Sequence, residues 1–187
     1  MNEKVLIQKC QENDYAAQLT VYNLYKDMMY NTSVRIVRSR EDAEDIIQEC
    51  FIKGFQKMHQ IKEEVSLGSW LKRIVINSSL DRVRKKKQQT WIEETRVLDI
   101  ETEEPELESY SEVSVKHIKE CMNQLKEKYR IILVLYMIED YNHREISDLL
   151  NIKESTVRNQ YRRGKSQLLD LLKKTQGNGF KTAHTGS

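Results

Sequence analysis

The sequence lacks the features of a membrane protein or of a proline- and glycine-rich fibrous chain. Its 187 residues include one proline and six glycines, and the mean hydropathy is -0.71. No apolar run reaches the ~18 residues that a membrane-spanning helix needs, and Met1 to Lys4 carry no hydrophobic targeting core. These absences exclude collagen-like, low-complexity and membrane-spanning classes. They predict a soluble, cytoplasmic protein.

Residues with reactive or metal-binding side chains are few and scattered. The three cysteines have no CxxC spacing and are odd in number, so neither a disulfide framework nor a zinc site is expected, and the four histidines do not cluster. The chain also has no Gly-rich phosphate loop, no nucleophile motif and no HExxH motif. We therefore predict a binding protein with no catalytic residue, no metal, no cofactor and no small-molecule substrate.

Charge is distributed unevenly along the chain, although the formal net charge is only +2. Residues 1–89 hold 16 Lys and Arg against 12 Asp and Glu, residues 90–112 hold 1 against 9, and residues 113–187 hold 14 against 8. Two basic segments joined by an acidic one predict two surfaces for a polyanion. Nucleic acid is the first candidate.

Apolar residues recur mostly with the 3.6-residue period of helices, which predicts an all-α fold. We expect helices over Val5–Cys10, Tyr15–Val37, Glu41–Met58, Ser69–Lys87, Val113–Leu125, Tyr129–Ile138, Asn142–Leu150 and Lys153–Lys173. Asp14 is the candidate N-cap of the second helix, on which Leu19 lies on the side assigned to the core, and a loop that contains Gly68 precedes the fourth. Residues 90–112 contain the only proline and repel themselves, as in a flexible linker. The predicted organisation is a helical domain over 1–89, an acidic linker over 90–112, a second helical domain over 113–174 and a disordered tail over 175–187.

The segment Glu41–Met58 has two different sides. Ala43, Ile46, Cys50 and other apolar residues form a stripe that we assign to the core. Asp45, Gln48, Glu49 and Ile52 form a row at i, i+3, i+4 and i+7 outside that stripe. The row fits either a solvated face or a protein-binding face.

A basic block, WLKRIVINSSLDRVRKKK, follows over Trp70–Lys87. At ~100° per residue, an aromatic side chain, an amide and arginines fall within one sector of a helix. This combination suits unpaired bases and their phosphates, since stacking needs an aromatic face. The sector contains Trp70, Arg73, Asn77, Asp81 and Arg84, with Lys85 beside it. Trp70 fits a domain-anchoring core residue equally well.

The segment Tyr141–Leu172 has the layout of a helix-turn-helix, which makes it the strongest local pattern. Asn142 and Glu145 are spaced as a capping box, and Asn151 suits the left-handed position that ends a helix. Gly164 lies on the apolar stripe of the second helix, which predicts a close approach to another helix there. The side opposite this stripe carries arginine and asparagine side chains, which match base edges in the major groove. The candidate DNA-binding residues are Thr156, Arg158, Asn159, Arg162 and Arg163. A solvated basic face is the alternative.

The chain resembles the extracytoplasmic-function sigma factors of the sigma-70 family at three ordered motifs. These are DAEDIIQECFIKGF (Asp42–Phe55), SWLKRIVINSSLDRVRKKK (Ser69–Lys87) and the helix-turn-helix from Tyr141. The resemblance implies a bacterial transcription initiation factor whose partners are core RNA polymerase and promoter DNA. It also implies an anti-sigma factor, which is often membrane-bound.

The resemblance gives each motif a role. The first motif would bind the clamp helices of the largest polymerase subunit through Asp45, Gln48, Glu49 and Ile52. The second, together with the loop His59–Gly68 before it, would melt and read the −10 element. This assigns Trp70, Arg73, Asn77, Arg84 and Lys85 to the separating strand, while Asp81 would hold neighbouring basic side chains. The helix-turn-helix would read the −35 element through Thr156, Arg158, Asn159, Arg162 and Arg163.

Two other functions fit parts of the sequence. A stand-alone helix-turn-helix regulator needs the basic C-terminal helix but gives the Asp45 row and the Trp70 block no joint task. A nucleic-acid-processing enzyme would need a carboxylate site, which Asp42, Glu44, Asp45 and Glu49 could form with a divalent metal. Binding to core polymerase separates the sigma factor from the first, and a metal-dependent nuclease assay separates it from the second.

Overall fold

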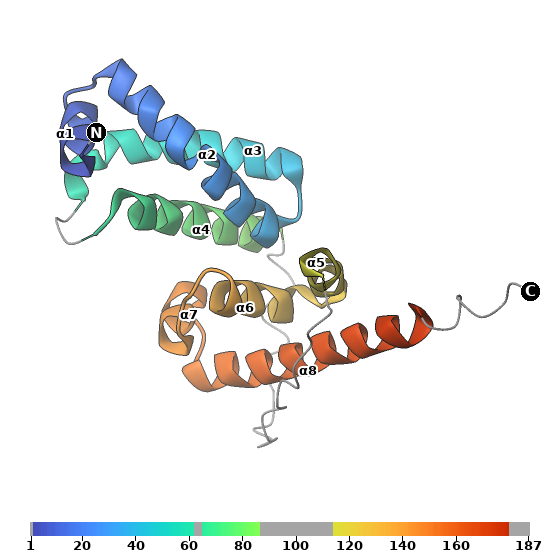
Figure 1. Ribbon diagram of the computed structural model, residues 1–187. Coiled ribbons are helices and arrows are strands. Elements are labelled where there is room, and N and C mark those ends of the chain that lie inside the picture. Colours follow the sequence, from blue (N-terminus) through green and yellow to red (C-terminus); the bar gives the residue numbers. More distant parts are fainter. Residues whose placement is uncertain (1, 62–64, 87–113, 180–187) are drawn as a thin grey trace, which may run out of the picture. The chain divides into compact units, whose positions relative to one another are not determined.

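The computed structural model of the protein describes residues 2–61, 65–86 and 114–179 (Figure 1), and these ranges are helical between their turns. The chain divides into two compact units, Met1–Thr95 and Arg96–Ser187. The first holds α1 (Glu3–Gln11), α2 (Tyr15–Val37), α3 (Arg40–Gln56), a 3-10 turn (Met58–Gln60) and α4 (Leu67–Lys86); the second holds α5 (Val115–Gln124), α6 (Glu127–Met137), α7 (His143–Leu150) and α8 (Glu154–Gly179). The predicted all-α fold is confirmed.

Side-chain caps start the helices of the first unit. Asp14 accepts a hydrogen bond from the Ala17 amide at 2.9 Å, as predicted, and Ser39 accepts one from the Asp42 amide at 3.1 Å. Each cap satisfies a helix N–H group that would otherwise have no partner in the helix. Because Ser39 provides the cap, α3 begins at Arg40, one residue earlier than predicted.

The core of the first unit lies among α2, α3 and α4, which pack side by side with α1 at one end (Figure 1). The predicted apolar stripe of α3 is buried except for Phe55, which is partly buried. Cys10 and Cys50 are also buried, and burial raises the pKa of both thiols, as expected for cysteines that act as small apolar side chains. One assignment was wrong: Leu19, expected on the core side of α2, is 45% exposed.

The start of α4 is fixed by contacts with α1 and α2. The Leu67 amide donates a hydrogen bond to the carboxylate of Glu3, so a side chain from α1 satisfies an amide at the start of α4. Gly68, expected in a loop, is helical, and a Cβ at this position would lie 3.0 Å from Cε1 of Tyr25. The connection from the 3-10 turn contains residues 62–64, which lie outside the described residues, so part of the predicted −10 loop is not described.

The second unit is built around α6, in which every residue from Tyr129 to Leu135 is buried. The predicted capping box of α7 is confirmed: Asn142 accepts from the Glu145 amide at 3.0 Å, and Glu145 accepts from the Asn142 amide at 2.8 Å. Asn151 ends α7 in the left-handed region with φ 54° and ψ 46°, as predicted. The helix-turn-helix therefore consists of α7 and α8.

Glycine at position 164 lets α8 approach α6 closely. A Cβ there would lie 3.1 Å from Cβ of Tyr129 and 3.3 Å from Cδ1 of Leu133. The close helix approach predicted for Gly164 is confirmed. Helix α8 continues to Gly179, beyond the predicted end at Lys173, so the backbone of residues 175–179 is helical where a tail was expected. Residues 180–187 and the whole predicted linker, 90–112, lie outside the described residues.

Candidate protein and nucleic-acid interfaces

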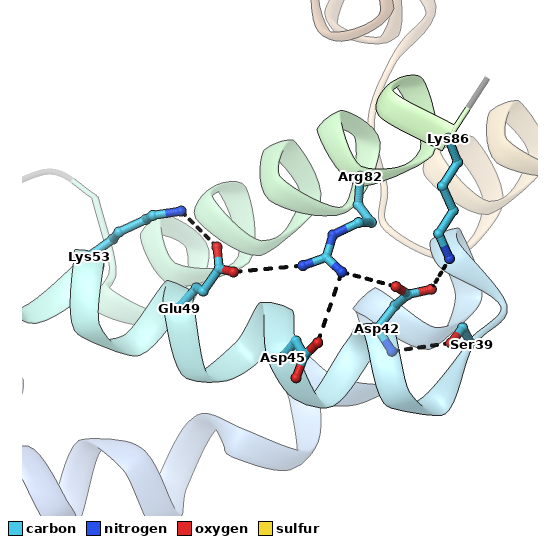
Figure 2. Close-up of polar contacts among 7 residues, drawn as sticks. All are labelled: Ser39, Asp42, Asp45, Glu49, Lys53, Arg82 and Lys86. Atoms are coloured by element: carbon cyan, nitrogen blue, oxygen red, sulfur yellow. Dashed lines mark hydrogen bonds and ion pairs between the residues drawn. The ribbon is translucent and has the colours of Figure 1, made fainter. Parts of the chain in front are cut away.

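A network of charged side chains joins α3 to α4 in the first unit (Figure 2). The Arg82 guanidinium of α4 lies between three carboxylates of α3: Nη1 is 3.0 Å from Asp42 Oδ1 and 4.0 Å from Asp45 Oδ2, and Nη2 is 3.7 Å from Glu49 Oε1. These carboxylates recur at i, i+3 and i+7, so they share one side of α3. A single cation thus offsets the repulsion among three acids.

Asp42 is the most buried acid in this network. Its second oxygen, Oδ2, binds the ammonium of Lys86, one turn along α4 from Arg82. The hydrogen bond from Lys86 and those with Ser39 and Arg82 lower the pKa of Asp42, although burial alone would raise it. Asp42 is therefore a carboxylate at neutral pH, and its negative charge is stabilised by cations of a different helix.

The four residues predicted to bind a protein partner, Asp45, Gln48, Glu49 and Ile52, are all exposed on α3. Ile52 is 58% exposed although it is a large apolar side chain. Glu49 also accepts a hydrogen bond from Lys53 at 3.1 Å, and this contact is the main cause of its lowered pKa. The row therefore combines accessible carboxylates with an accessible apolar side chain. Its role in binding stays a prediction.

The candidate −10 residues of α4 differ in how far they are available. Trp70 is partly buried and packs against the core, with Cζ3 3.7 Å from where a Cβ of Gly54 would lie. This packing supports the interpretation of Trp70 as a residue that anchors the domain, while base stacking by Trp70 stays a prediction. Arg73, Asn77, Arg84 and Lys85 are exposed. The expectation that Asp81 holds a neighbouring basic side chain is confirmed, since Arg84 Nη1 lies 2.9 Å from Asp81 Oδ1.

The candidate −35 residues lie in the first half of α8. Arg158 and Arg163 are exposed, whereas Thr156, Asn159 and Arg162 are partly buried. Arg158 donates to Glu154 Oε1 from Nε at 3.2 Å and from Nη2 at 2.6 Å, which lowers the pKa of Glu154. The Nε of Arg162 is buried and lacks a hydrogen-bond partner among the residues that the structure describes. Of the three candidate arginines, Arg163 is therefore the one that is exposed and has no ion pair with another residue of the described part of the chain.

Sequence reasoning missed two groupings that the fold creates. Asp42, Arg82 and Lys86 come together although Asp42 is 40 and 44 residues from its partners. In the second unit, the rings of Tyr136, His143 and Tyr161 meet with centroids 4.6 to 5.2 Å apart. Helical periodicity places each residue on a face of its own helix, but it does not say which helix that face will meet.

Neither a membrane-spanning helix nor a metal-binding cluster is found in the described part of the chain. None of its helices is long and apolar enough to cross a membrane. Within the same ranges, no three His, Cys, Asp or Glu side chains are grouped so that they could hold a metal ion.

The two units each match a family model. The family model described as "Sigma-70 region 2" matches residues 21–89, and the model described as "Sigma-70, region 4" matches residues 116–168. The curated protein "ECF RNA polymerase sigma factor SigW" of Bacillus subtilis (strain 168) is 29% identical over 91% of this chain and 96% of its own length. "ECF RNA polymerase sigma factor SigE" of Mycolicibacterium smegmatis (strain ATCC 700084 / mc(2)155) is 30% identical, over 80% of this chain and 59% of that protein.

Solved structures agree on the fold. The sigma factor RpoE, solved with the anti-sigma factor NepR from Bartonella quintana, matches with a TM-score of 0.55 and 18% identity over 82% of this chain and 95% of that chain. CnrH, solved with the cytosolic domain of CnrY, matches with a TM-score of 0.54 and 14% identity over 91% and 97%.

With both family regions present in order, the chain belongs to the sigma-70 family and, within it, to the extracytoplasmic-function sigma factors. Members of this family are transcription initiation factors. The protein directs promoter-specific initiation together with RNA polymerase.

Proposed function

We propose that the three exposed surfaces divide the work of initiation. The row Asp45, Gln48, Glu49 and Ile52 on α3 binds core polymerase, the exposed face of α4 engages the separated −10 strand, and α8 reads the −35 duplex. The observation that carries this proposal is the placement of the acidic row and the basic face on neighbouring helices of one unit, with a second basic helix in the other unit. Region 2 would extend over residues 1–89 and region 4 over 113–174.

The α3 row has the composition of a protein-binding surface. Its two carboxylates can pair with basic side chains of a partner, and the exposed Ile52 supplies apolar area that gains from being covered. By the family resemblance, the partner surface is the pair of clamp helices in the largest polymerase subunit. Because exposed charges are screened by salt, this contact should weaken as ionic strength rises.

The exposed face of α4 suits a single strand better than a duplex. Arg73, Arg84 and Lys85 supply cations for phosphates, and Asn77 supplies an amide that can hydrogen-bond an unpaired base. Trp70, anchored in the core, would offer only its exposed part for stacking. Holding the separated strand would shift the duplex-opening equilibrium towards the open state.

Helix α8 would lie in the major groove at the −35 element. Exposed Arg163 and Arg158 can reach base edges or phosphates, and Thr156, in the first turn of α8, suits a phosphate contact. Arg158 would have to leave Glu154 to do so, a small cost for an exposed ion pair. Arg162 and Asn159 complete the predicted base-reading set.

The remaining assignments follow from this function. The protein would act in the cytoplasm and perform no bond chemistry itself, since the polymerase supplies catalysis. An anti-sigma factor, free or membrane-bound, would be a further partner. This proposal is supported by the similar structure of the sigma factor RpoE in complex with the anti-sigma factor NepR, and by that of CnrH in complex with the cytosolic domain of CnrY.

The decisive experiment is reconstitution with bacterial core RNA polymerase. We expect the purified chain to co-elute with core enzyme in a stoichiometric complex and to direct transcripts from a randomised promoter pool with defined start sites. A folded, inhibitor-free chain that binds selected duplex DNA but not core polymerase would instead be a stand-alone helix-turn-helix regulator. The selected promoters would also define both elements.

Charge reversal on α3 tests the polymerase surface directly. Glu49→Lys should weaken binding to core polymerase because it places a cation where a basic partner surface is expected. Glu44→Lys is the matched control, since Glu44 is also exposed on α3 but outside the row. Equal binding by both variants would remove Glu49 from the interface.

A further inference from the structure

Two neighbouring lysines at the end of α4 have different surroundings. Lys85 is exposed and forms no ion pair within the described part of the chain, although its charge contributes to the lowered pKa of Glu49. Lys86 is also exposed, yet its ammonium is bound to Asp42 of α3 (Figure 2). Both belong to the basic block Trp70–Lys87, of which the proposed function uses Lys85 but not Lys86. Only one of them has its charge neutralised by a direct contact.

The Asp42 carboxylate binds α4 as a phosphate group would. Each of its oxygens accepts from a different cation, Oδ1 from Arg82 at 3.0 Å and Oδ2 from Lys86. Charge-assisted hydrogen bonds of this type are the ones that Arg and Lys form with DNA phosphates. The Asp42 side chain is only 12% exposed and lies in the first turn of α3, where a negative charge is favoured. The Asp42 carboxylate is thus an anion of the protein itself that occupies cations which a DNA phosphate could otherwise bind.

The two cations depend on Asp42 to different degrees. The Arg82 side chain is 27% exposed and also lies near Asp45 and Glu49, so it keeps anionic neighbours without Asp42. The Lys86 side chain is 60% exposed, and its one ion pair with a described residue is the contact to Asp42. Neutralising Asp42 would therefore release Lys86 to solvent while Arg82 stays in the network.

We propose that Asp42 is a positioning residue that withholds Lys86 from nucleic acid and so limits the phosphate contacts that α4 makes. This inference rests on the proposed function, in which the exposed face of α4 binds the −10 strand. Affinity for DNA without regard to sequence grows with each phosphate that a protein neutralises. Withholding this cation at the end of α4 lowers binding to DNA at large, while the exposed Arg73, Arg84 and Lys85 remain to hold the promoter strand.

The test is binding of the full-length protein to a fluorescent single-stranded DNA of mixed sequence, followed by anisotropy over a range of salt concentrations. Four variants are compared with the original chain: Asp42→Asn, Lys86→Gln, the double variant, and Lys85→Gln as the matched neighbour. Asparagine has nearly the shape of aspartate, and circular dichroism with thermal melting checks that each variant is folded. The two lysine changes are at exposed positions, so they test the proposal even if Asp42→Asn fails to fold.

We expect Asp42→Asn to bind DNA about fivefold more tightly at 0.1 M salt, because one added phosphate contact on a single strand raises the salt slope by ~0.7. The double variant should return to the original affinity. Lys86→Gln alone should change nothing, whereas Lys85→Gln should weaken binding by a similar factor.

Three results would overturn the inference: no gain in Asp42→Asn, a gain that survives in the double variant, or a loss in Lys86→Gln equal to that in Lys85→Gln. Failure of the proposed function looks different. If Lys85→Gln leaves DNA binding unchanged, the face of α4 is not where the strand lies, whatever Asp42 does.

Discussion

The two basic helices, α4 and α8, differ in where their ion pairs lie. The cations Arg82 and Lys86 of α4 pair with Asp42 of α3, so charge joins one helix to another. On α8, Arg158 pairs with Glu154 of the same helix, and the described contact with α6 is apolar, through Gly164 against Tyr129 and Leu133.

This difference bears on what each helix can do. Charges that cross between α3 and α4 link the proposed polymerase surface to the proposed −10 surface, so a change at one alters the field at the other. The ion pair of α8 lies within one helix and is exposed, although the charges of Arg144 and His143 on α7 also lower the pKa of Glu154. The first unit is thus suited to couple two partners, and the second to present one surface.

The largest expected effect comes from the apolar contact of α8. Gly164→Leu should lower the free energy of unfolding by about 3 kcal/mol, which is the upper end of the range for overpacking. This loss is expected even though leucine favours a helix more than glycine does. The reason is the 3.1 Å distance already present between a Cβ at this position and Cβ of Tyr129. Amide hydrogen exchange should show lost protection in α6 and α8.

Ser166→Leu is the control for this change, because Ser166 is exposed on the same helix. It should leave exchange almost unaltered. A Gly164→Leu variant as protected as the control would mean that α8 does not depend on its close approach to α6.

A smaller loss of stability is expected when the charged contact between α4 and α3 is removed. Arg82→Gln should cost about 2 kcal/mol, the range for hydrogen bonds to charged groups, because Asp42 then keeps only Lys86 and three carboxylates lose their shared cation. Urea unfolding followed by circular dichroism measures this change. Retention of full stability would show that the network does not hold α3 and α4 together.

Acid should remove part of the stability that the contacts of Asp42 provide. The pKa of Asp42 is lowered in the folded protein, so its stabilising effect is complete above the unfolded pKa of about 3.9 and is lost as the pH falls through the folded pKa. The difference in unfolding free energy between the original chain and Asp42→Asn should therefore be constant from pH 7 to pH 5 and shrink below pH 4. Urea titrations at each pH would reveal this, and a difference as large at pH 3 as at pH 7 would contradict the assignment.

The smallest effect is expected at the exposed ion pair of α8. Arg158→Gln should change stability by no more than about 0.5 kcal/mol, since both side chains are in contact with solvent. The comparison with Arg82→Gln is direct, because the two changes remove the same group. Equal losses at the two positions would abolish the distinction between the helices.

Much of the fold could be predicted because it depends on short-range patterns. Asp14, the Asn142 capping box and Asn151 mark helix ends through bonds to residues nearby in the chain, and all three were confirmed. The stripe of α3 was confirmed for the same reason. Leu19 and Gly68 were misjudged, since burial on the long α2 and the entry into α4 depend on which other helices pack there.

The candidate site divides in the same way. The sequence placed Asp45, Glu49 and Ile52 on one exposed face and the arginines of α8 on another, because a helix fixes the angle between its own residues. It did not reveal that Arg82 and Lys86 meet Asp42, and it left open whether Trp70 packs into the core. Those contacts join residues up to 44 positions apart and exist only once the helices are packed.

The sequence by itself determined the helices, their caps, the helix-turn-helix and the family, since each depends on local periodicity, on bonds within a few residues or on ordered motifs. The tertiary structure alone decided which cations are paired across helices and which stay exposed to a partner. The physical reason is that ion pairing and burial depend on distance in space, which the order of residues does not specify.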